Sequence, residues 1–489
     1  MVRSGVTERR VLQDAFVAVL ALCVGGAFVA SNVIYNHGYL SAPLDDVFIH
    51  LQYGRQLSEG QWFRYNDGAP MSTGASSLLY MILLGVGHAL GFQGSLLLNF
   101  AIGMGVVLLA ATAVLSCELG RCLGGEKSGL WSGVLIATNG PFAWGATSGM
   151  EVPLLAALLL SALLVFWYEF PKGKFLATPV LLTLAALTRP EGLIFATVMM
   201  VVSLLRLFEV FRRRQIDPKK LVANGLLTLC PFAVGAGQLI FYHLTTGTSV
   251  ANGIQAKSVL YEPIFYPTEA LALAFSRLLK LLLDVFSGLD VRGYLFPGAV
   301  LFVILGISRL LSFGTQYRAV TMAAVIASAL GLLSITTLET WSNHSYRYFL
   351  PFFPILIVLA VVGISSLSST ETIKSLDMPV YKGLIGFALV FSLIALPAWA
   401  VKMGQESAEI REQQISIGLW VRNNLPPEAR VAVNDAGAIR YYGDHAIVDL
   451  VGLVTNRFTE PSRSGPGSIY EALEGMAPEQ RPDYFVIYP

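Results

Sequence analysis

Two adjacent carboxylates, Asp45 and Asp46, are the first residues of this sequence that suggest chemistry. They lie in PLDDVFIHLQYGRQL, residues 43–57, shortly after a long apolar stretch. A second acidic position, Glu151 in ATSGMEVP, comes just before another apolar stretch. Separated carboxylates suit acid or base catalysis at one cleft, because a base must lie within hydrogen-bond reach of the proton it removes. Solvation, helix capping and a favourable charge at a helix N-terminus remain alternatives for all three.

The overall composition indicates whether these carboxylates belong to a soluble or a membrane protein. Of the 489 residues, 54% are apolar and only 13% are charged, and the mean hydropathy is +0.62. These values are typical of an integral membrane protein. The net charge is +1 without a long basic or acidic run, so no nucleic-acid partner is expected. The four cysteines lie inside or at the ends of apolar stretches, which favours buried thiols over a disulfide framework.

Apolar runs of about 20 residues, the length that crosses a bilayer, predict about eleven transmembrane helices. The first run follows Arg9 and Arg10 and has no A-x-A cleavage site, so it is expected to stay uncleaved. The shorter run SSLLYMILLGVGHALG, residues 76–91, is interpreted as an interfacial helix. The eleven runs cover residues 15–35, 95–117, 128–147, 151–170, 174–188, 192–208, 221–243, 294–312, 318–338, 348–368 and 383–401.

The basic residues indicate the orientation, because cytoplasmic loops hold the excess of Lys and Arg. If residues 76–91 do not cross, the strongest basic cluster, RLFEVFRRRQIDPKK at 206–220, faces the cytoplasm together with the N-terminus. We therefore expect a multi-pass protein of the cytoplasmic (inner) membrane. The same topology places most of the interesting polar segments outside, namely residues 36–94, 146–153, 188–192, 244–293, 339–348 and the chain after Val401.

The first outer loop, residues 36–94, contains a pattern that would hold a carboxylate at membrane level. Residues 45–60, DDVFIHLQYGRQLSEG, mix apolar with charged residues and predict an amphipathic helix on the membrane with its acidic N-terminus exposed. His50 lies four residues after Asp46 and thus on the same helix face. It can hydrogen-bond the acid, contribute a metal ligand or be an ordinary residue of the polar face.

The composition changes after the last apolar run. A helical segment ends at Leu425, and the runs RVAV, AIVDL and DYFVIY have the character of short strands. This pattern predicts a small extracytoplasmic α/β domain at residues 402–489, following a transmembrane domain at residues 1–401.

Five segments, taken in order, resemble a known family. They are DDVFIHLQYGRQLSEGQWFRYNDGAPMSTGASSLLY, SGMEVPLLAALLL, LAALTRPEGLIFA, YRYFLPFFPILIVLA and LPPEARVAVNDAGAIRYYGDHAIVDLVGL. Together they resemble the GT-C glycosyltransferases, and most of all bacterial members near the mycobacterial terminal arabinofuranosyltransferases. The resemblance covers most of the chain. It implies a membrane all-α catalytic domain with a GT-C-like fold, which transfers a sugar from a polyprenyl-phosphate carrier to an acceptor hydroxyl outside the cell membrane, usually with inversion.

The resemblance also implies roles for the carboxylates. The acidic residue of the first outer loop is the family's proposed base, which points to Asp45 or Asp46. Glu151 matches a second acidic position, where oligosaccharyltransferases carry two acidic residues that help to bind a metal. Here Val152 and Pro153 follow a single Glu. The function thus requires no cofactor, although a divalent cation is possible and the metal ligands are unknown.

A polyprenyl phosphate leaving group carries less charge than a nucleotide diphosphate, so Arg or Lys side chains alone can stabilise it. Each candidate can instead be an anchor at the membrane interface. In TRPEG, Arg189 and Glu191 interrupt an apolar stretch and predict a tight turn in which they can form a structural pair. The candidates for the donor phosphate are Arg189, Lys257 and Arg347, followed by Arg55.

The sequence therefore predicts a glycosyltransferase whose partners are a polyprenyl-phosphate-linked sugar, the lipid bilayer and a glycan, lipid or protein acceptor. A multi-span transporter or a flippase for lipid-linked sugars is the alternative, since many spans with few polar residues fit either. Internal repeats would favour a transporter, and none is convincing in this sequence. The sugar and the acceptor are not encoded in any recognisable pattern.

Overall fold

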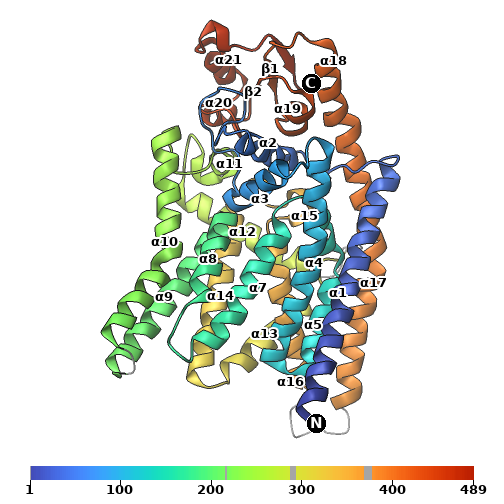
Figure 1. Ribbon diagram of the computed structural model, residues 1–489, viewed down its shortest axis with the longest axis vertical. Coiled ribbons are helices and arrows are strands. Elements are labelled where there is room, and N and C mark those ends of the chain that lie inside the picture. Colours follow the sequence, from blue (N-terminus) through green and yellow to red (C-terminus); the bar gives the residue numbers. More distant parts are fainter. Residues whose placement is uncertain (1, 215–216, 287–292, 368–376, 489) are drawn as a thin grey trace.

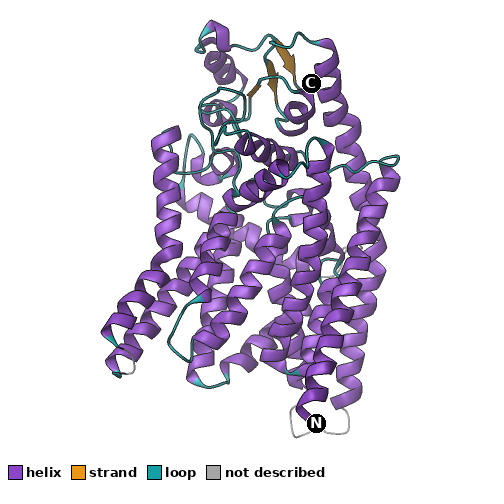
Figure 2. Ribbon diagram, viewed as in Figure 1, coloured by secondary structure: helices purple, strands orange, loops and turns teal. Residues whose placement is uncertain are grey.

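The protein consists of a helix bundle with a small α/β domain at one end. The computed structural model describes residues 2–214, 217–286, 293–367 and 377–488. The N-terminus lies at one end of the bundle and the α/β domain lies at the other, which we call the domain end (Figure 1). Figure 2 shows the strands of the described residues within that domain.

Within the described ranges, eight helical segments are long and apolar enough to cross a membrane. The seventh segment, Asn343–Leu367, includes short helices ahead of its main helix, and the eighth, Pro379–Asn424, continues into the α/β domain. The helices that form the eight segments are α1 (Val2–Tyr35), α4 (Ser95–Gly124), α7 (Val152–Glu169), α9 (Pro190–Arg212), α10 (Pro218–Thr246), α14 (Thr315–Ile335), α16 (Phe353–Leu367) and α17 (Asp377–Ile410).

The other three predicted spans are also helical but form shorter helices. The predicted span at 128–147 is divided between α5 (Glu126–Ala137) and α6 (Gly140–Thr147). The division has a local cause, because the Asn139 side chain caps α6 by accepting the Phe142 N–H at 2.9 Å. Pro141 also favours a helix start at this position, because its missing N–H would have no partner in the first turn of a helix. The spans predicted at 174–188 and 294–312 correspond to α8 (Ala177–Thr188) and α13 (Ala299–Leu311).

The first loop, residues 36–94, forms two helices at the domain end, α2 (Asp46–Ser58) and α3 (Leu78–Ala89) (Figure 1). Residues 76–91 thus do not cross the bundle, as predicted. The helix predicted at 45–60 is present as α2. Its acidic start was expected to be exposed, and the Asp46 side chain is 22% exposed. Most of α2 is buried, because α3 and the α/β domain pack against it.

The segment after α10 was expected to be a long loop at 244–293, and the described part of it is largely helical. Residues 287–292 of that prediction lie outside the described residues. Two further short helices precede α16. The elements concerned are α11 (Asn252–Lys257), η1 (Val259–Tyr261), α12 (Pro267–Phe286), α15 (Asn343–Tyr346) and η2 (Leu350–Phe352).

The α/β domain contains a parallel three-stranded sheet in the order β2-β1-β3, and Val431 of β1 pairs with Ile447 and with Tyr484. The three predicted strands are therefore confirmed. No linker separates the bundle from this domain at residue 401, because the helix α17 continues past that residue. It leads through the π-helical turn η4 directly into α18. The elements are η4 (Arg411–Ile415), α18 (Ser416–Asn424), β1 (Val431–Val433), α19 (Gly437–Gly443), β2 (Ile447–Asp449), α20 (Thr459–Ser464), α21 (Pro466–Glu474), η5 (Pro478–Gln480) and β3 (Tyr484–Val486).

The first loop and the α/β domain share one hydrophobic core. Ile49, Tyr53 and Tyr65 of the loop pack with buried side chains of the domain such as Val431 and Ile439. Burial of a large apolar side chain contributes about 1.5–3 kcal/mol, so this contact fixes the domain over the loop. This shared core matters for function because Asp45 and Asp46 lie at the start of the first helix of the loop.

Candidate active site

A cavity of about 220 Å³ lies at the domain end of the bundle, among the first loop, α9, α11, α14 and the α/β domain. It collects residues that are far apart in the sequence. Six of the side chains proposed from the sequence line it, namely Asp46, His50, Arg189, Glu191, Lys257 and Arg347. The fold thus brings side chains from separate segments of the sequence to one cavity, whereas Asp45, Glu151 and Arg55 are not among the residues that line it.

Asp46 lies in the first turn of α2 and pairs with two cations. Its Oδ2 accepts a hydrogen bond from Lys257 Nζ at 3.2 Å and another from Arg347 Nη2. Burial by itself would favour the neutral acid, but Lys257 and Arg347 lower the pKa of Asp46 well below its usual range. Asp46 is therefore an ionised carboxylate whose strength as a base is limited by the two cations it binds.

Arg347 offers further hydrogen-bond donors. Its side chain is only 4% exposed, and its Nε and Nη1 are buried and have no hydrogen-bond partner in the described part of the protein. Buried donors without a partner are costly, so they commonly mark a place where a ligand or water completes the set. Arg347 and Lys257 both bind Asp46 Oδ2, and two neighbouring cations suit an anion.

Tyr348 lies between the two arginines of the cavity. Its ring centroid is 4.8 Å from the guanidinium carbon of Arg189 and 4.8 Å from that of Arg347. The Tyr348 hydroxyl also accepts a hydrogen bond from Arg347 Nη2 at 2.9 Å. Sequence reasoning missed this residue, although its position next to Arg347 in YRYF was an available signal. The aromatic ring orients both guanidinium groups.

Arg189 forms a buried cluster with two carboxylates rather than offering a free charge. It joins α8 to α9 in an extended conformation, and Pro190 starts α9. Its Nε donates to Glu191 Oε2 at 2.9 Å, which is the structural pair predicted for this turn, and its Nη1 pairs with Glu151 Oε1. Burial opposes ionisation of Glu151, yet the charge of Arg189 holds its pKa below the usual value.

Two buried polar atoms near this cluster have no hydrogen-bond partner within the described residues, namely Glu151 Oε2 and His50 Nε2. The other ring nitrogen of His50 lies 3.1 Å from the Asp46 backbone oxygen, so His50 does not bond the Asp46 carboxylate. The described residues contain no group of three or more His, Cys, Asp or Glu side chains that could hold a metal ion.

Asp45, the other half of the acidic pair, has a different role. Its Oδ2 and Oδ1 accept the backbone N–H groups of Gly437 and Ala438, each at 2.7 Å, at the start of α19. Gly437 is needed at this contact, because an added Cβ would lie 2.2 Å from the Asp45 backbone oxygen. Burial raises the pKa of Asp45 to about 7. Asp45 therefore ties the first loop to the α/β domain.

Arg55 is not brought into the cavity. Its Nε donates to Glu59 at 3.1 Å, and its Nη1 donates to Asp444 of the α/β domain at 3.0 Å. The sequence-based assignment of Arg55 to a phosphate has no support in this geometry. The helix α2 places Arg55 more than two turns beyond Asp46, where the side chain meets the α/β domain instead.

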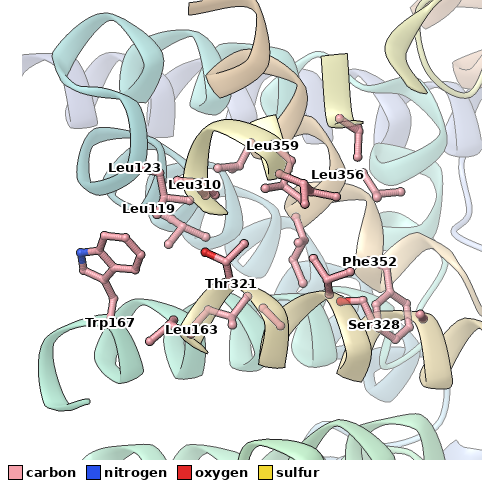
Figure 3. A pocket seen from close by; sticks show the side chains of 18 of the residues that line it. Leu119, Leu123, Leu163, Trp167, Leu310, Thr321, Ser328, Phe352, Leu356 and Leu359 are labelled. Carbon is pink, nitrogen blue, oxygen red and sulfur yellow. The ribbon is translucent and has the colours of Figure 1, made fainter. Parts of the chain in front are cut away.

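A second cavity, of about 190 Å³, lies deeper in the bundle among α4, α7, α13, α14 and α16. Figure 3 shows its apolar side chains, with Trp167 at one end and Phe352 near the other. The two cavities share the helix α14. On α14, Leu332 lines the apolar cavity and Ser334 lines the polar one.

Solved structures with the same arrangement are membrane enzymes. The chain superposes on the apo oligosaccharyltransferase of Archaeoglobus fulgidus with a TM-score of 0.55 and 13% identity, covering 91% of this chain and 65% of that one. It superposes on ArnT from Cupriavidus metallidurans bound to undecaprenyl phosphate with a TM-score of 0.55 and 13% identity, covering 92% of this chain and 88% of ArnT.

The chain has the GT-C fold. The coverage rises to 96% of this chain and 92% of the neighbour for apo ArnT, again with a TM-score of 0.55 and 13% identity. The chain spans just under two thirds of the length of the oligosaccharyltransferase, and identities this low show the GT-C fold alone. The predicted fold class, a membrane all-α domain followed by a small α/β domain, is confirmed. The closer likeness to arabinofuranosyltransferases stays a prediction.

The sequence comparisons add one match. A family model described as a domain of unknown function (DUF8728) matches residues 408–489, which correspond to the α/β domain and the end of the helix that leads into it. No curated protein matches the sequence.

Proposed function

We propose that this protein is an inverting glycosyltransferase that moves a sugar from a polyprenyl-phosphate carrier to an acceptor hydroxyl, with Asp46 as the general base. The observation that carries the proposal is the group formed by Asp46, Lys257 and Arg347 in one cavity. This group has one net positive charge, and two buried N–H donors of Arg347 have no partner among the described residues. A sugar linked to a polyprenyl phosphate is a phosphodiester with one negative charge, which matches it.

The ion pairs of Asp46 suggest how donor binding prepares the base. The donor phosphate competes with Asp46 for Lys257 and Arg347. Once these cations turn toward the phosphate, Asp46 loses the charges that hold its pKa low and becomes a stronger base. Binding of the donor thus activates the carboxylate in the place where the acceptor must be deprotonated.

In the transfer step, Asp46 takes the proton of the acceptor hydroxyl while the acceptor oxygen bonds to the anomeric carbon. The bond between that carbon and the phosphate oxygen breaks, and the electron pair leaves with the polyprenyl phosphate. Attack from the face opposite the phosphate inverts the anomeric configuration. Lys257 and Arg347 stabilise the charge that develops on the leaving phosphate, which needs no metal ion for this purpose.

The two cavities together fit the two parts of the donor. The phosphate and the sugar occupy the polar cavity, and the polyprenyl chain extends along α14 into the apolar cavity. The support for this placement is the order of the lining residues on α14. Ser334 lines the polar cavity, and Leu332, about half a turn earlier on the same helix, lines the apolar one. The support from known structures is the GT-C fold and a neighbour whose structure contains undecaprenyl phosphate.

Glu151 and His50 are proposed to contact hydroxyl groups of the bound substrates. Each has one buried polar atom without a protein partner, and a hydroxyl can both donate and accept a hydrogen bond. Arg189 orients Glu151 from the other side, with Glu191 as its second partner. We place the whole site on the extracytoplasmic side of the inner membrane, with the N-terminus in the cytoplasm, because of the basic cluster at 206–220.

The test is transfer of labelled sugar from a pool of polyprenyl-phosphate sugars to cell-envelope acceptors by the purified protein in nanodiscs. We expect transfer by the wild type and a loss of about 100-fold for Arg347→Ala, because a charged hydrogen-bond partner of the phosphate is removed. If the wild type consumes no donor but carries lipid-linked sugar across a liposome membrane, the flippase alternative replaces this proposal.

A further inference from the structure

Arg463 of the α/β domain reaches into the segment that carries Lys257. Its Nη1 donates to the backbone oxygens of Gln255 at 3.0 Å and of Ser258 at 2.9 Å, on either side of Lys257. Its Nη2 pairs with Glu262 at 2.8 Å and with Glu339 at 3.0 Å. The Arg463 side chain is only 7% exposed, whereas the side chains of Glu262 and Glu339 are 36% and 46% exposed.

The contacts of Arg463 close a ring around Lys257. Glu339, which accepts from Arg463, donates its own backbone N–H to the Lys257 oxygen at 2.6 Å. An antiparallel bridge between Ser258 and Leu338 runs beside this bond. The backbone of Lys257 is thereby fixed from two directions, while its side chain extends to Asp46. A short helix of six residues such as α11 has little rigidity of its own, so the ring supplies it.

A second group of contacts from the α/β domain reaches the same place independently. Asn456 accepts a hydrogen bond from Asn252, the first residue of α11, at 3.0 Å, and donates one to the Met71 oxygen of the first loop at 2.7 Å. Leu453 lines the polar cavity. Residues 453–463 of the α/β domain thus form part of the cavity wall and also hold α11 at both ends.

We infer that the α/β domain is part of the active site and that Arg463 is a positioning residue, which sets Lys257 at the distance where it binds the donor phosphate. This inference rests on the proposed function and deepens it. Arg463 acts through the backbone and is not among the residues that line the polar cavity. Misplacing a substrate-binding group by about 1 Å can cost up to ~100-fold in rate, so the effect of losing this ring is measurable.

A double-mutant cycle on the full-length protein in nanodiscs tests the inference, with undecaprenyl phosphate as the probe. We expect Lys257→Ala to weaken its binding about 30-fold, in line with the loss of a charge-assisted contact. Arg463→Ala should weaken it about tenfold in the wild-type background and less than twofold in the Lys257→Ala background. Such non-additivity arises when one residue acts through the other, whereas a general loss of structure weakens both backgrounds equally.

Arg481→Ala is the matched control, because Arg481 also bonds two backbone oxygens and a carboxylate of the α/β domain, those of Met476 and Glu474, without touching α11. It should leave the affinity unchanged. If Arg463→Ala does not fold, Arg463→Lys replaces it, with an expected loss of about threefold, since an ammonium group can satisfy part of the ring.

The outcomes separate this inference from the proposed function. Equal losses from Arg463→Ala in both backgrounds, or no loss in either, overturn the positioning role while Lys257 keeps its place in the proposed site. Unchanged binding in Lys257→Ala removes Lys257 from the phosphate site, and the positioning role is then refuted with it. Transfer activity gives the second readout, because a misplaced Lys257 raises the KM for the donor more than it lowers kcat.

Discussion

Replacing Asp46 by Asn removes the proposed base while keeping the size and shape of the side chain. A positioned general base contributes about 10²–10⁴-fold to a rate, which is about 2.7–5.4 kcal/mol at about 1.36 kcal/mol for each factor of ten. We therefore expect kcat for sugar transfer to fall by at least about 100-fold. Because the amide still accepts a hydrogen bond from Lys257 or Arg347, the fold should be retained.

The same substitution should strengthen donor binding, which distinguishes a base from a structural residue. In the wild type, the phosphate must displace the Asp46 carboxylate from two charge-assisted hydrogen bonds, each of about 1.5–3 kcal/mol. A neutral amide competes far less. We expect the dissociation constant of undecaprenyl phosphate to fall about tenfold in Asp46→Asn, and the opposite changes in kcat and affinity form the signature.

The assay follows labelled sugar from a defined polyprenyl-phosphate donor in nanodiscs, with the binding of undecaprenyl phosphate measured on the same preparations. Asp45→Asn is the matched control, because it alters the neighbouring carboxylate, which binds α19 instead of lining the cavity. It should lower the melting temperature and change kcat by less than about fivefold. Transfer by Asp46→Asn within threefold of the wild type, or a loss of donor binding in that variant, would refute the reasoning.

Three further predictions follow from the contacts of other side chains. Burial raises the pKa of Asp45 to about 7, so the folded protein binds more protons than the unfolded one between about pH 4 and pH 7. The free energy of unfolding of the wild type relative to Asp45→Asn, measured by chemical unfolding, should therefore fall by up to about 1.4 kcal/mol per pH unit as the pH rises through this window, and a constant difference would contradict the pKa. Arg55→Ala should leave the KM for the donor unchanged and cost about 0.2–1 kcal/mol in chemical unfolding, because Arg55 makes only partly exposed ion pairs; a tenfold rise in KM would return it to the site. Glu151→Ala should destabilise the protein by about 3–5 kcal/mol, measured as thermal unfolding in detergent, since it leaves the buried Arg189 with an incomplete set of partners, and Glu151→Gln should recover part of this loss.

The membrane architecture was predictable because hydrophobic length is a local property of the sequence. All eleven apolar runs are helical, and three strands of the α/β domain occur where alternating apolar residues indicated them. Two features were not predicted from hydropathy, namely the division of the span at 128–147 and the helix α12. The break of the span at 128–147 depends on one side chain, since Asn139 begins a new helix. The helix α12 has too many charged residues to stand out as a span, and it lies within the predicted loop 244–293.

Within the site, the sequence supplied residue types but not their partners. Asp45 and Asp46 are neighbours of the same kind, and no pattern separates the carboxylate that binds α19 from the one that binds Lys257 and Arg347. Only the position of the α/β domain makes that distinction, because backbone N–H groups from residues 437 and 438 are available to Asp45 alone. The domain also packs against α2, so most of that helix is buried.

What the sequence determined by itself is the set of apolar helical runs, their order along the chain and the charged residues at their ends, since these depend on residues close in the chain. What only the tertiary structure decided is which charges meet. Lys257 and Arg347 lie 211 and 301 residues from Asp46, and Arg463 holds Lys257 from more than 200 residues further along. Ion pairs over such separations depend on the packing of whole elements, which leaves no periodic signal in the sequence.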